Sequence, residues 1–237
     1  MDRVLVRITL VALVVALLVG GLFAVAGRWD WMQGWAYLAM IVGGGTVTDI
    51  ILWWWSPELL RRRSHLGQGT KTWDKIILFV FGVTSVLMMF VGALDSGRYQ
   101  WSVMSPWLWP VGAALFIAGH ILLTWSMLAN PFFEKTARLQ TDRGHRVIDS
   151  GPYRFVRHPG YVATIVGLVV GSPMMLGSWW AFIPALATVF GLVLRTSLED
   201  RMLIQELPGY AAYAKRVPFS SHLCGSSMPS VIAAIVR

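Results

Sequence analysis

Six apolar segments in this chain are long enough, or nearly long enough, to cross a membrane as helices. They are residues 8–27, 34–55, 76–94, 107–129, 161–176 and 178–194. About 20 helical residues cover the ~30 Å hydrocarbon core of a bilayer. A helix satisfies its own backbone hydrogen bonds, which lipid cannot do. The sequence therefore predicts an all-α integral membrane helical bundle with about six spans.

The composition favours the same class of protein. Hydrophobic residues make up 56% of the chain and charged residues 14%, whereas roughly 25% of the residues of a soluble domain are charged. The 13 Trp residues fit side chains that anchor helices at the lipid headgroups. Cys224 is the only cysteine, which excludes intramolecular disulfides and multi-Cys metal sites. Because His65, His145 and His222 also lack partners at metal-ligand spacing, we predict no metal site.

The ends of the chain and its last two apolar segments leave alternatives open. Segments 161–176 and 178–194 are short and meet at Gly177, so they predict a tight helical hairpin. Five spans plus a re-entrant hairpin is the alternative to six spans. The basic start is followed by an apolar run with no convincing small-residue cleavage site, which predicts an uncleaved first span. Residues 231–236 are too few to span, and we expect 219–237 to be a frayed or surface-lying tail.

The positive charges predict the orientation of the spans. If the N-terminus is inside, only Arg28 and Arg98 of the 20 Lys and Arg residues fall in outer segments. Because cytoplasmic loops are enriched in Lys and Arg, we predict a multi-pass protein of the inner or cell membrane with both termini in the cytoplasm. The net charge of +8 then matches anionic lipid headgroups, and we predict no nucleic-acid partner.

Polar residues gather in two of the predicted cytoplasmic regions, 130–158 and 199–237. We therefore expect the chemistry of this protein at its cytoplasmic face. The same pattern predicts three parts: a four-span membrane region over residues 1–129, a functional core over 130–218 that contains the hairpin, and a tail over 219–237.

The first polar motif is the segment GPYRFVRHPGY, residues 151–161. Pro159 suits the first turn of a helix, which would place Arg157 and His158 at a helix N-terminus. Backbone N–H groups and the helix dipole attract anions there, so a carboxylate or phosphate ligand is one interpretation. The other is interfacial anchoring by the Arg and Tyr side chains of the segment.

The second polar motif follows the last apolar segment. Glu199 and Asp200 come first, and Arg195 precedes Glu199 by one helical turn. Either Arg195 and Glu199 form a salt bridge within the helix, or the acids bind an ammonium or sulfonium ligand. After a Pro-Gly break, Tyr210 and Tyr213 share one side of a short helix. These tyrosines either pack on the bilayer surface or form the wall of an aromatic pocket.

Two ionisable residues lie inside predicted spans, Asp49 and His120. Such groups are costly in a bilayer, so both are candidates for a functional site. The alternative for His120 is a hydrogen bond to a neighbouring helix. Three consecutive glycines, Gly43, Gly44 and Gly45, indicate close helix packing rather than a phosphate-binding loop.

The two polar motifs, with the hydrophobic hairpin between them, resemble the isoprenylcysteine carboxyl methyltransferase and phospholipid methyltransferase superfamily, in its bacterial type. The resemblance covers residues 130–218, including the stretch from Asn130 to Gln140, and the first four spans are similar in hydropathy only. The residues that carry it are Gly151, Pro152, Tyr153, Arg157, His158, Pro159, Tyr161, Arg195, Glu199, Asp200, Leu203, Tyr210, Tyr213, Val217 and Pro218.

The resemblance implies a methyltransferase that binds S-adenosyl-L-methionine between the hairpin and the C-terminal segment. It implies a lipid or lipidated small-molecule acceptor, an isoprenylcysteine carboxylate or a related lipid headgroup, in the cytoplasmic leaflet. The expected catalytic residues are Arg195, which would orient an anionic acceptor headgroup, and Glu199, which would hold the ammonium of the cofactor. The expected cofactor-binding residues are Tyr153, Arg157, His158, Pro159, Tyr161, Glu199, Asp200, Leu203, Tyr210 and Tyr213.

Two other functions remain open from the sequence. A membrane reductase of the sterol-reductase type would bind a phosphate-rich nicotinamide cofactor at Arg157 and His158, but it would have little use for the two acids at 199 and 200. A non-catalytic membrane partner or small transporter would bind no cofactor. In that case Asp49 and His120 would line a path near the centre of the bilayer.

Overall fold

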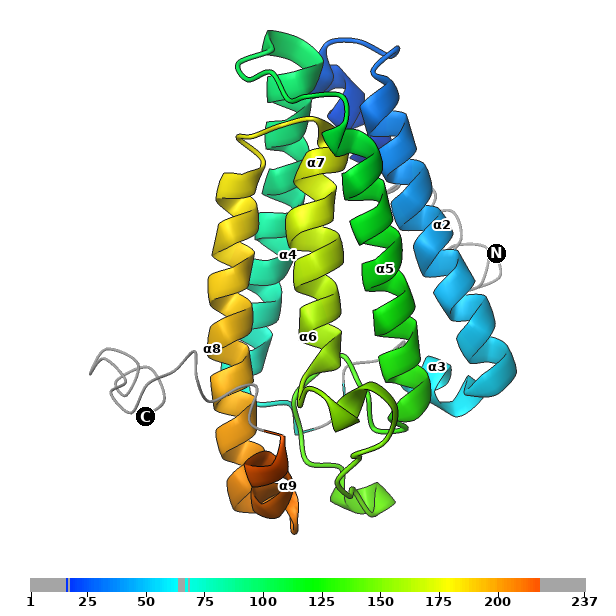
Figure 1. Cartoon of the computed structure of the whole chain (residues 1–237), viewed down its shortest axis with the longest axis vertical. Helices are drawn as coiled ribbons and strands as arrows, with labels where there is room; N and C mark the ends of the chain where they lie inside the picture. Colours follow the sequence, from blue (N-terminus) through cyan, green and yellow to red (C-terminus); the bar gives the residue numbers. More distant parts are fainter. Residues whose placement is uncertain (1–15, 17, 64–66, 68, 218–237) are drawn as a thin grey trace, which may run out of the picture.

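The computed structural model describes residues 16, 18–63, 67 and 69–217 (Figure 1). Among these residues the chain forms helices, turns and loops and contains no strand, which confirms the predicted fold class. The α-helices are α2 (Met32–Trp55), α3 (Pro57–Arg63), α4 (Thr72–Gly92), α5 (Leu108–Ala129), α6 (Pro159–Thr164), α7 (Ser172–Leu176), α8 (Phe182–Glu206) and α9 (Tyr210–Arg216). The other helical segments are η1 (Ala93–Tyr99), η2 (Thr141–Arg143), η3 (Gly151–Arg154) and η4 (Ile165–Gly171).

Five helices in the described part of the chain are long and apolar enough to cross a membrane. They are Met32–Trp55, Thr72–Tyr99, Leu108–Ala129, Pro159–Leu176 and Phe182–Glu206. Each coincides with one of the five later spans expected from the sequence, so the chain is an integral membrane protein. Most of the first expected span, 8–27, lies outside the described residues, although residues 18–26 are helical. The expected tail, 219–237, lies outside them entirely.

The last apolar segment was predicted to end at residue 194, and the structure corrects this boundary. Helix α8 continues for three more turns, to Glu206. The added turns are polar, but Arg195, Asp200 and Glu206 have charged partners in other elements. The helix therefore does not need to end at the edge of the apolar run. Gly177 (φ +69°) ends α7 in the left-handed region that favours glycine and begins the hairpin turn to α8.

Glycines let α5 pack closely against the span formed by α6, η4 and α7. A Cβ atom on Gly119 would lie 2.7 Å from the Cα of Gly167, and a Cβ on Gly112 would lie 2.8 Å from the carbonyl oxygen of Gly171. Small residues at such contacts allow helix backbones to approach each other in a membrane. This contact positions the N-terminus of α6, which carries the first polar motif.

Replacing Gly119 with Leu is expected to destabilise the protein by about 2 kcal/mol, because the new side chain overpacks the contact between α5 and η4. Thermal unfolding in detergent measures the effect. The matched control is Gly82→Leu on α4, where a Cβ would meet no atom within 4 Å, and we expect a change below about 0.5 kcal/mol. Equal shifts in the two variants would show that the glycine contact is not tight.

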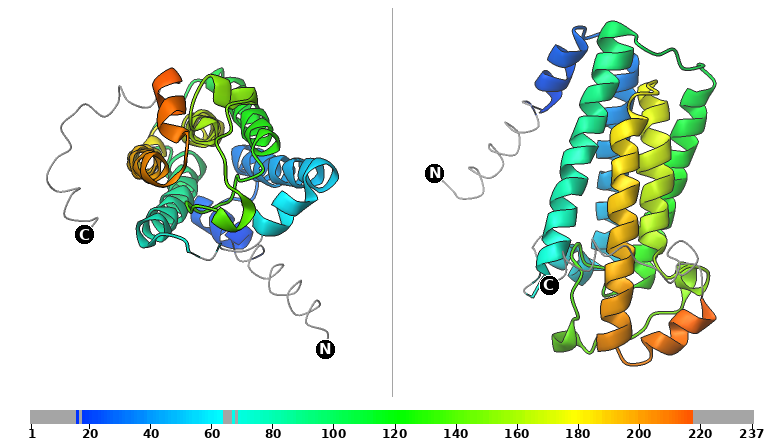
Figure 2. Two further views of the ribbon diagram at one scale, coloured as in Figure 1. Left: turned by 90° about the horizontal axis from the view of Figure 1, so that it is seen from below. Right: turned by 90° about the vertical axis from the view of Figure 1, so that its left-hand side faces the viewer.

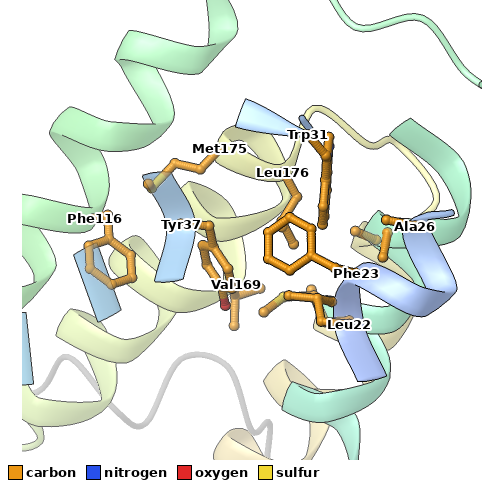
Figure 3. Close-up of a cluster of buried hydrophobic side chains, with 13 residues drawn as sticks. Leu22, Phe23, Ala26, Trp31, Tyr37, Phe116, Val169, Met175 and Leu176 are labelled. Atoms are coloured by element: carbon orange, nitrogen blue, oxygen red, sulfur yellow. The ribbon is translucent and has the colours of Figure 1, made fainter. Parts of the chain in front are cut away.

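A cluster of buried apolar side chains joins the helices at the end of the bundle away from α9 (Figure 3). The helical segment 18–26 contributes Leu22 and Phe23, and Tyr37 and Leu176 come from α2 and α7. At the same end Asp95 is fully buried, and its carboxylate accepts hydrogen bonds from two serine hydroxyls in the adjoining loops. These buried side chains form a structural core at this end of the bundle.

The opposite end of the bundle, which we call the polar end, consists of α3, residues 130–158 and α9 (Figures 1 and 2). The short elements η2 and η3 belong to it. Arg28 and Arg98, the two cations expected outside, lie in elements at the other end. The cytoplasmic location of the polar end remains a prediction from charge, as does the division into three domains.

Candidate functional site

A cavity of about 560 Å³ lies at the polar end between α4, α6 and α8. Residues 130–148 and α9 form the rest of its wall. Its polar part is lined by side chains such as His158, Tyr161 and Glu199. Its apolar part is lined by α4 and α8, including Phe81 and Thr188. Because a helix rises 1.5 Å per residue, Thr188 lies about 16 Å along α8 from Glu199. The cavity thus reaches from the polar end deep into the membrane-spanning region.

The structure brings almost all of the predicted site residues together around this cavity. The residues that line it are Tyr153, Arg157, His158, Pro159, Tyr161, Arg195, Glu199, Leu203, Tyr210 and Tyr213. Asp200 is the exception, because it lies behind the wall and holds the lining residues in place. The functional roles of all these residues remain predictions.

Local sequence explains how the first motif reaches the cavity. Gly151 has φ +56°, a conformation that L side chains rarely adopt, and it begins the turn η3. The turn places the hydroxyl of Tyr153 3.2 Å from the side-chain nitrogen of Asn130 at the end of α5. Pro159 is the first residue of α6, where its missing N–H costs nothing, and His158 occupies the N-cap.

Asp200 is the centre of a buried network that joins α6, α8 and α9. Its carboxylate accepts hydrogen bonds from Arg157 Nη2 at 2.8 Å and from the Tyr210 hydroxyl at 2.6 Å. His158 Nε2 lies 2.8 Å from Oδ1 of Asp200, the same oxygen that accepts the Tyr210 hydroxyl. Burial, with Asp200 next to it, raises the pKa of Tyr210, so this phenol stays a donor. Asp200 is therefore committed to protein partners.

Arg157 acts as a clamp on the C-terminal end of α9. Its Nη1 donates to the carbonyl oxygens of Ala214 and Val217, both at 2.9 Å, while Nη2 binds Asp200. Only 7% of the residue is exposed. Cations favour helix C-termini because the last carbonyls there lack partners within the helix. Most of the guanidinium that we predicted for the cofactor thus binds the protein itself, although Nε is buried without a partner.

Glu199 differs from the other acids of the site. Its Oε2 accepts a hydrogen bond from the Tyr161 hydroxyl, and His158 Nδ1 lies 3.9 Å away. The rings of His158 and Tyr161 stack at 5.2 Å. In the described part of the chain Glu199 forms no ion pair with Lys or Arg, and its side chain is 22% exposed toward the cavity. Among the described carboxylates that line the cavity, Glu199 is thus the one without a Lys or Arg partner.

Arg195 pairs with an acid from another helix, so the first of the two interpretations, a salt bridge within α8, is wrong. Its Nε lies 2.7 Å from Asp74 Oδ1, and its Nη2 donates to the carbonyl of Lys135 at 2.8 Å. The guanidinium also lies over the ring of Tyr161, 5.4 Å from its centroid. Asp74 belongs to α4 and is fully buried. A direct role for Arg195 on an acceptor headgroup remains a prediction, but its charge is already balanced.

Sequence reasoning missed several residues of the site. Asp74 lies in the first turn of an apolar helix, and that position was the available signal for it. Glu134 and Arg138 form a two-contact ion pair in the cavity wall, at 2.8 and 3.0 Å. His145 also lines the cavity. Burial lowers its pKa, so its imidazole is neutral at pH 7, and its Nδ1 accepts the backbone N–H of Gln140 at 3.3 Å.

Tyr213 secures α9 to the first motif. Its hydroxyl donates to the carbonyl of Tyr153 at 2.7 Å, and burial raises its pKa to about 12. Among the two interpretations of Tyr210 and Tyr213, the structure favours a pocket wall, because both rings are buried and line the cavity.

The two ionisable residues predicted inside spans, Asp49 and His120, lie away from the cavity. Asp49 is exposed on α2, and His120 on α5 stacks on the ring of Phe116 at 4.3 Å. A Cβ on Gly44 would lie 2.7 Å from the His120 ring, whereas Gly43 and Gly45 meet open space. Only one of the three glycines therefore makes a close helix contact. None of these residues lines the cavity.

The fold and the site define an integral membrane helical protein with a mixed polar and apolar cavity at one end. Residues 112–205 match the model of the isoprenylcysteine carboxyl methyltransferase (ICMT) family. Over this stretch the chain is similar to that family, which supports the resemblance drawn from the two motifs. The match begins in α5, earlier than expected, and ends in the last turn of α8, before α9.

Two relatives extend the comparison. The chain is 32% identical over 142 residues to the cobalt-zinc-cadmium resistance protein CzcN of Cupriavidus metallidurans, covering 58% of this chain and 61% of the relative. It is 30% identical over 138 residues to the nickel-cobalt-cadmium resistance protein NccN of Alcaligenes xylosoxydans xylosoxydans, covering 57% and 59%. The chain thus spans about three fifths of the length of these relatives.

Proposed function

We propose that this chain is an integral membrane methyltransferase that uses S-adenosyl-L-methionine (SAM) and acts on a lipid-like acceptor. The acceptor is an isoprenylcysteine carboxylate or a related lipid headgroup in the cytoplasmic leaflet. The observation that carries the proposal is Glu199, which has no Lys or Arg partner among the described residues, whereas Glu134, the other acid in the cavity lining, pairs with Arg138. The similarity of residues 112–205 to the methyltransferase family supports it.

The residues around the cavity fit the chemistry of SAM. The cofactor has an ammonium, a carboxylate, a sulfonium and an aromatic base. Glu199 matches the positive groups, and the buried Nε of Arg157 and hydroxyl of Thr136 are unpaired donors in the cavity wall. Tyr210 and Tyr213 offer ring surfaces. A volume of about 560 Å³ lies within the range of small-molecule sites.

When bound, SAM supplies a methyl group on a positively charged sulfur. Glu199 would attract the cationic cofactor, and the stacked pair of His158 and Tyr161 would fix the orientation of that carboxylate. Closure by α9 and residues 130–148 keeps water out, which favours a transfer in which charge disappears. Holding both reactants in one cavity supplies much of the remaining acceleration. A carboxylate acceptor has no proton to lose, whereas an ammonium acceptor would need a base, for which Glu199 is placed.

The apolar part of the cavity suits the tail of the acceptor. Helices α4 and α8 line this deeper part of the cavity with side chains that include Phe81 and Thr188. A lipid chain could lie there while its headgroup reaches the polar part. The concentration of Lys and Arg at the polar end supports a position of that headgroup in the cytoplasmic leaflet.

The two other functions considered from the sequence have less support. A phosphate-rich reductase cofactor would meet the unpaired Glu199 carboxylate, which repels it. The names of the relatives refer to metal resistance. In the part of the chain that the structure covers, no group of three or more His, Cys, Asp or Glu side chains is arranged to hold a metal ion. Our proposal therefore includes no metal site.

Transfer of labelled methyl groups tests the proposal. Purified protein in detergent is incubated with SAM carrying a tritiated methyl group and with a fractionated membrane lipid extract. We expect label in one lipid fraction, and mass spectrometry then identifies the product. NADPH oxidation in the same extract serves as the comparison reaction. Consumption of NADPH without labelled lipid would reject the methyltransferase in favour of the reductase.

A further inference from the structure

We propose that Asp74 is a positioning residue that keeps Arg195 away from Glu199, so that the Glu199 carboxylate stays open to a cationic ligand. This role rests on the proposed function only for the identity of the ligand. The choice of partner for Arg195, Asp74 on α4 or Glu199 on α8, does not depend on that identity.

Arg195 and Glu199 would be expected to pair with each other. They lie one turn apart on α8, and opposite charges at this spacing attract. Arg195 instead turns to α4, where its Nε contacts Asp74 Oδ1 at 2.7 Å and its Nη2 lies 3.4 Å from Oδ2. The interaction between helices has replaced the interaction within the helix.

The surroundings of Asp74 hold this pairing in place. The side chain is fully buried, and its Oδ2 also accepts the backbone N–H of Ala137 at 2.7 Å. The adjacent carbonyl of Lys135 accepts Arg195 Nη2. Asp74 and the carbonyl of Lys135 together satisfy the guanidinium, and the Ala137 N–H holds Asp74. A buried ion pair with such hydrogen bonds is strongly coupled, because either partner alone would be an uncompensated charge.

Loss of the Asp74 charge would free Arg195 to bind Glu199. The guanidinium already lies over the ring of Tyr161, whose hydroxyl binds Glu199. Without Asp74, a buried cation seeks another carboxylate, and Glu199 is one turn away. An Arg195–Glu199 pair would then compete with the ammonium or sulfonium of a ligand. Asp74 therefore affects binding without touching the ligand.

A stability cycle without ligand tests the pairing. Arg195→Met and Glu199→Gln are introduced one at a time and together, both in the native protein and in the Asp74→Asn variant. The thermal midpoint of each protein is measured in detergent. We expect almost no coupling between positions 195 and 199 when Asp74 is present, and about 2–4 °C of coupling when it is replaced. Equal coupling in both backgrounds would overturn the proposal.

Calorimetric binding of SAM tests the consequence. We expect Asp74→Asn to weaken binding about tenfold, and Asp74→Asn with Arg195→Met to restore native affinity within about twofold. Rescue by removal of Arg195 separates competition from simple structural damage. A double variant that binds as weakly as the single one would overturn the proposal, since Arg195 would then act on the ligand itself.

Two further comparisons complete the experiment. Asp149→Asn removes an exposed acid that pairs with Arg216 and is expected to change neither measurement. If Asp74→Asn alone does not fold, the variant with both Asp74→Asn and Arg195→Met is compared with the native protein, because removing both charges of a buried pair is often tolerated. Binding about tenfold weaker than native would then overturn the proposal. Absence of SAM binding by the native protein would contradict the proposed function, while the ligand-free cycle would still decide the role of Asp74.

Discussion

Replacing Glu199 with Gln is expected to weaken SAM binding by about 100-fold or more. The substitution keeps the size of the side chain but removes the charge that faces the ligand. Truncating one partner of a buried, hydrogen-bonded charge pair costs about 2–5 kcal/mol, and each 1.4 kcal/mol is about tenfold in affinity. Isothermal titration calorimetry of the purified protein measures the loss.

The control for this variant lies on the same helix. Glu206→Gln removes the same charge from an exposed side chain that pairs with Lys71 at 3.2 Å, outside the cavity. Its affinity for SAM is expected to match that of the native protein within about twofold, since exposed ion pairs contribute little. If Glu199→Gln binds as tightly as Glu206→Gln, Glu199 does not hold the ligand.

Replacing Arg157 with Met is expected to lower the thermal midpoint by about 10 °C. The change leaves the buried Asp200 carboxylate without its guanidinium and the carbonyls of Ala214 and Val217 without their donor. Removing one member of a buried ion pair costs about 3–5 kcal/mol, and each kcal/mol shifts the midpoint of a protein of this size by about 2–4 °C. Unfolding followed by intrinsic Trp fluorescence in detergent gives the value.

Arg216→Met is the matched comparison on α9. Arg216 pairs with Asp149 at 3.0 Å, and the two side chains are 67% and 53% exposed. Such a surface pair contributes about 0–1 kcal/mol, so we expect a shift of no more than about 3 °C. Similar midpoints for the two variants would mean that Arg157 is not the clamp that fixes α9 to the site.

The spans and the two motifs were predictable from the sequence because the bilayer imposes simple physical demands. Backbone groups in lipid must be satisfied within a helix, so segments 34–55 and 107–129 could be recognised from length and hydropathy alone. The turn at Gly151 and the helix start at Pro159 follow from local backbone chemistry. These local rules placed both polar motifs at one end of the bundle.

The pairing of charges could not be predicted, since it depends on contacts between distant segments. Arg195 and Glu199 satisfy the rule for a pair within a helix, yet Arg195 binds Asp74, 121 residues earlier in the chain. Arg157 was expected to face the ligand, but Asp200 and the end of α9 take most of its donors. In both cases a tertiary contact in a dry environment outweighs the local preference.

The extent of α8 was missed for the same reason. The apolar run ends at residue 194, while the helix continues to Glu206. Asp74 satisfies Arg195, and Arg157 satisfies Asp200, so the polar turns remain helical beyond the apolar run. The sequence alone shows the polarity of these turns but not the partners that make it tolerable.

A structure of the protein determined with S-adenosylhomocysteine, the demethylated form of the cofactor, tests the central claim most directly. We expect ligand density in the cavity between α6 and α8, with the amino nitrogen of the ligand within hydrogen-bond distance of the Glu199 carboxylate. An empty cavity at saturating ligand, or density bound away from Glu199, would contradict the account.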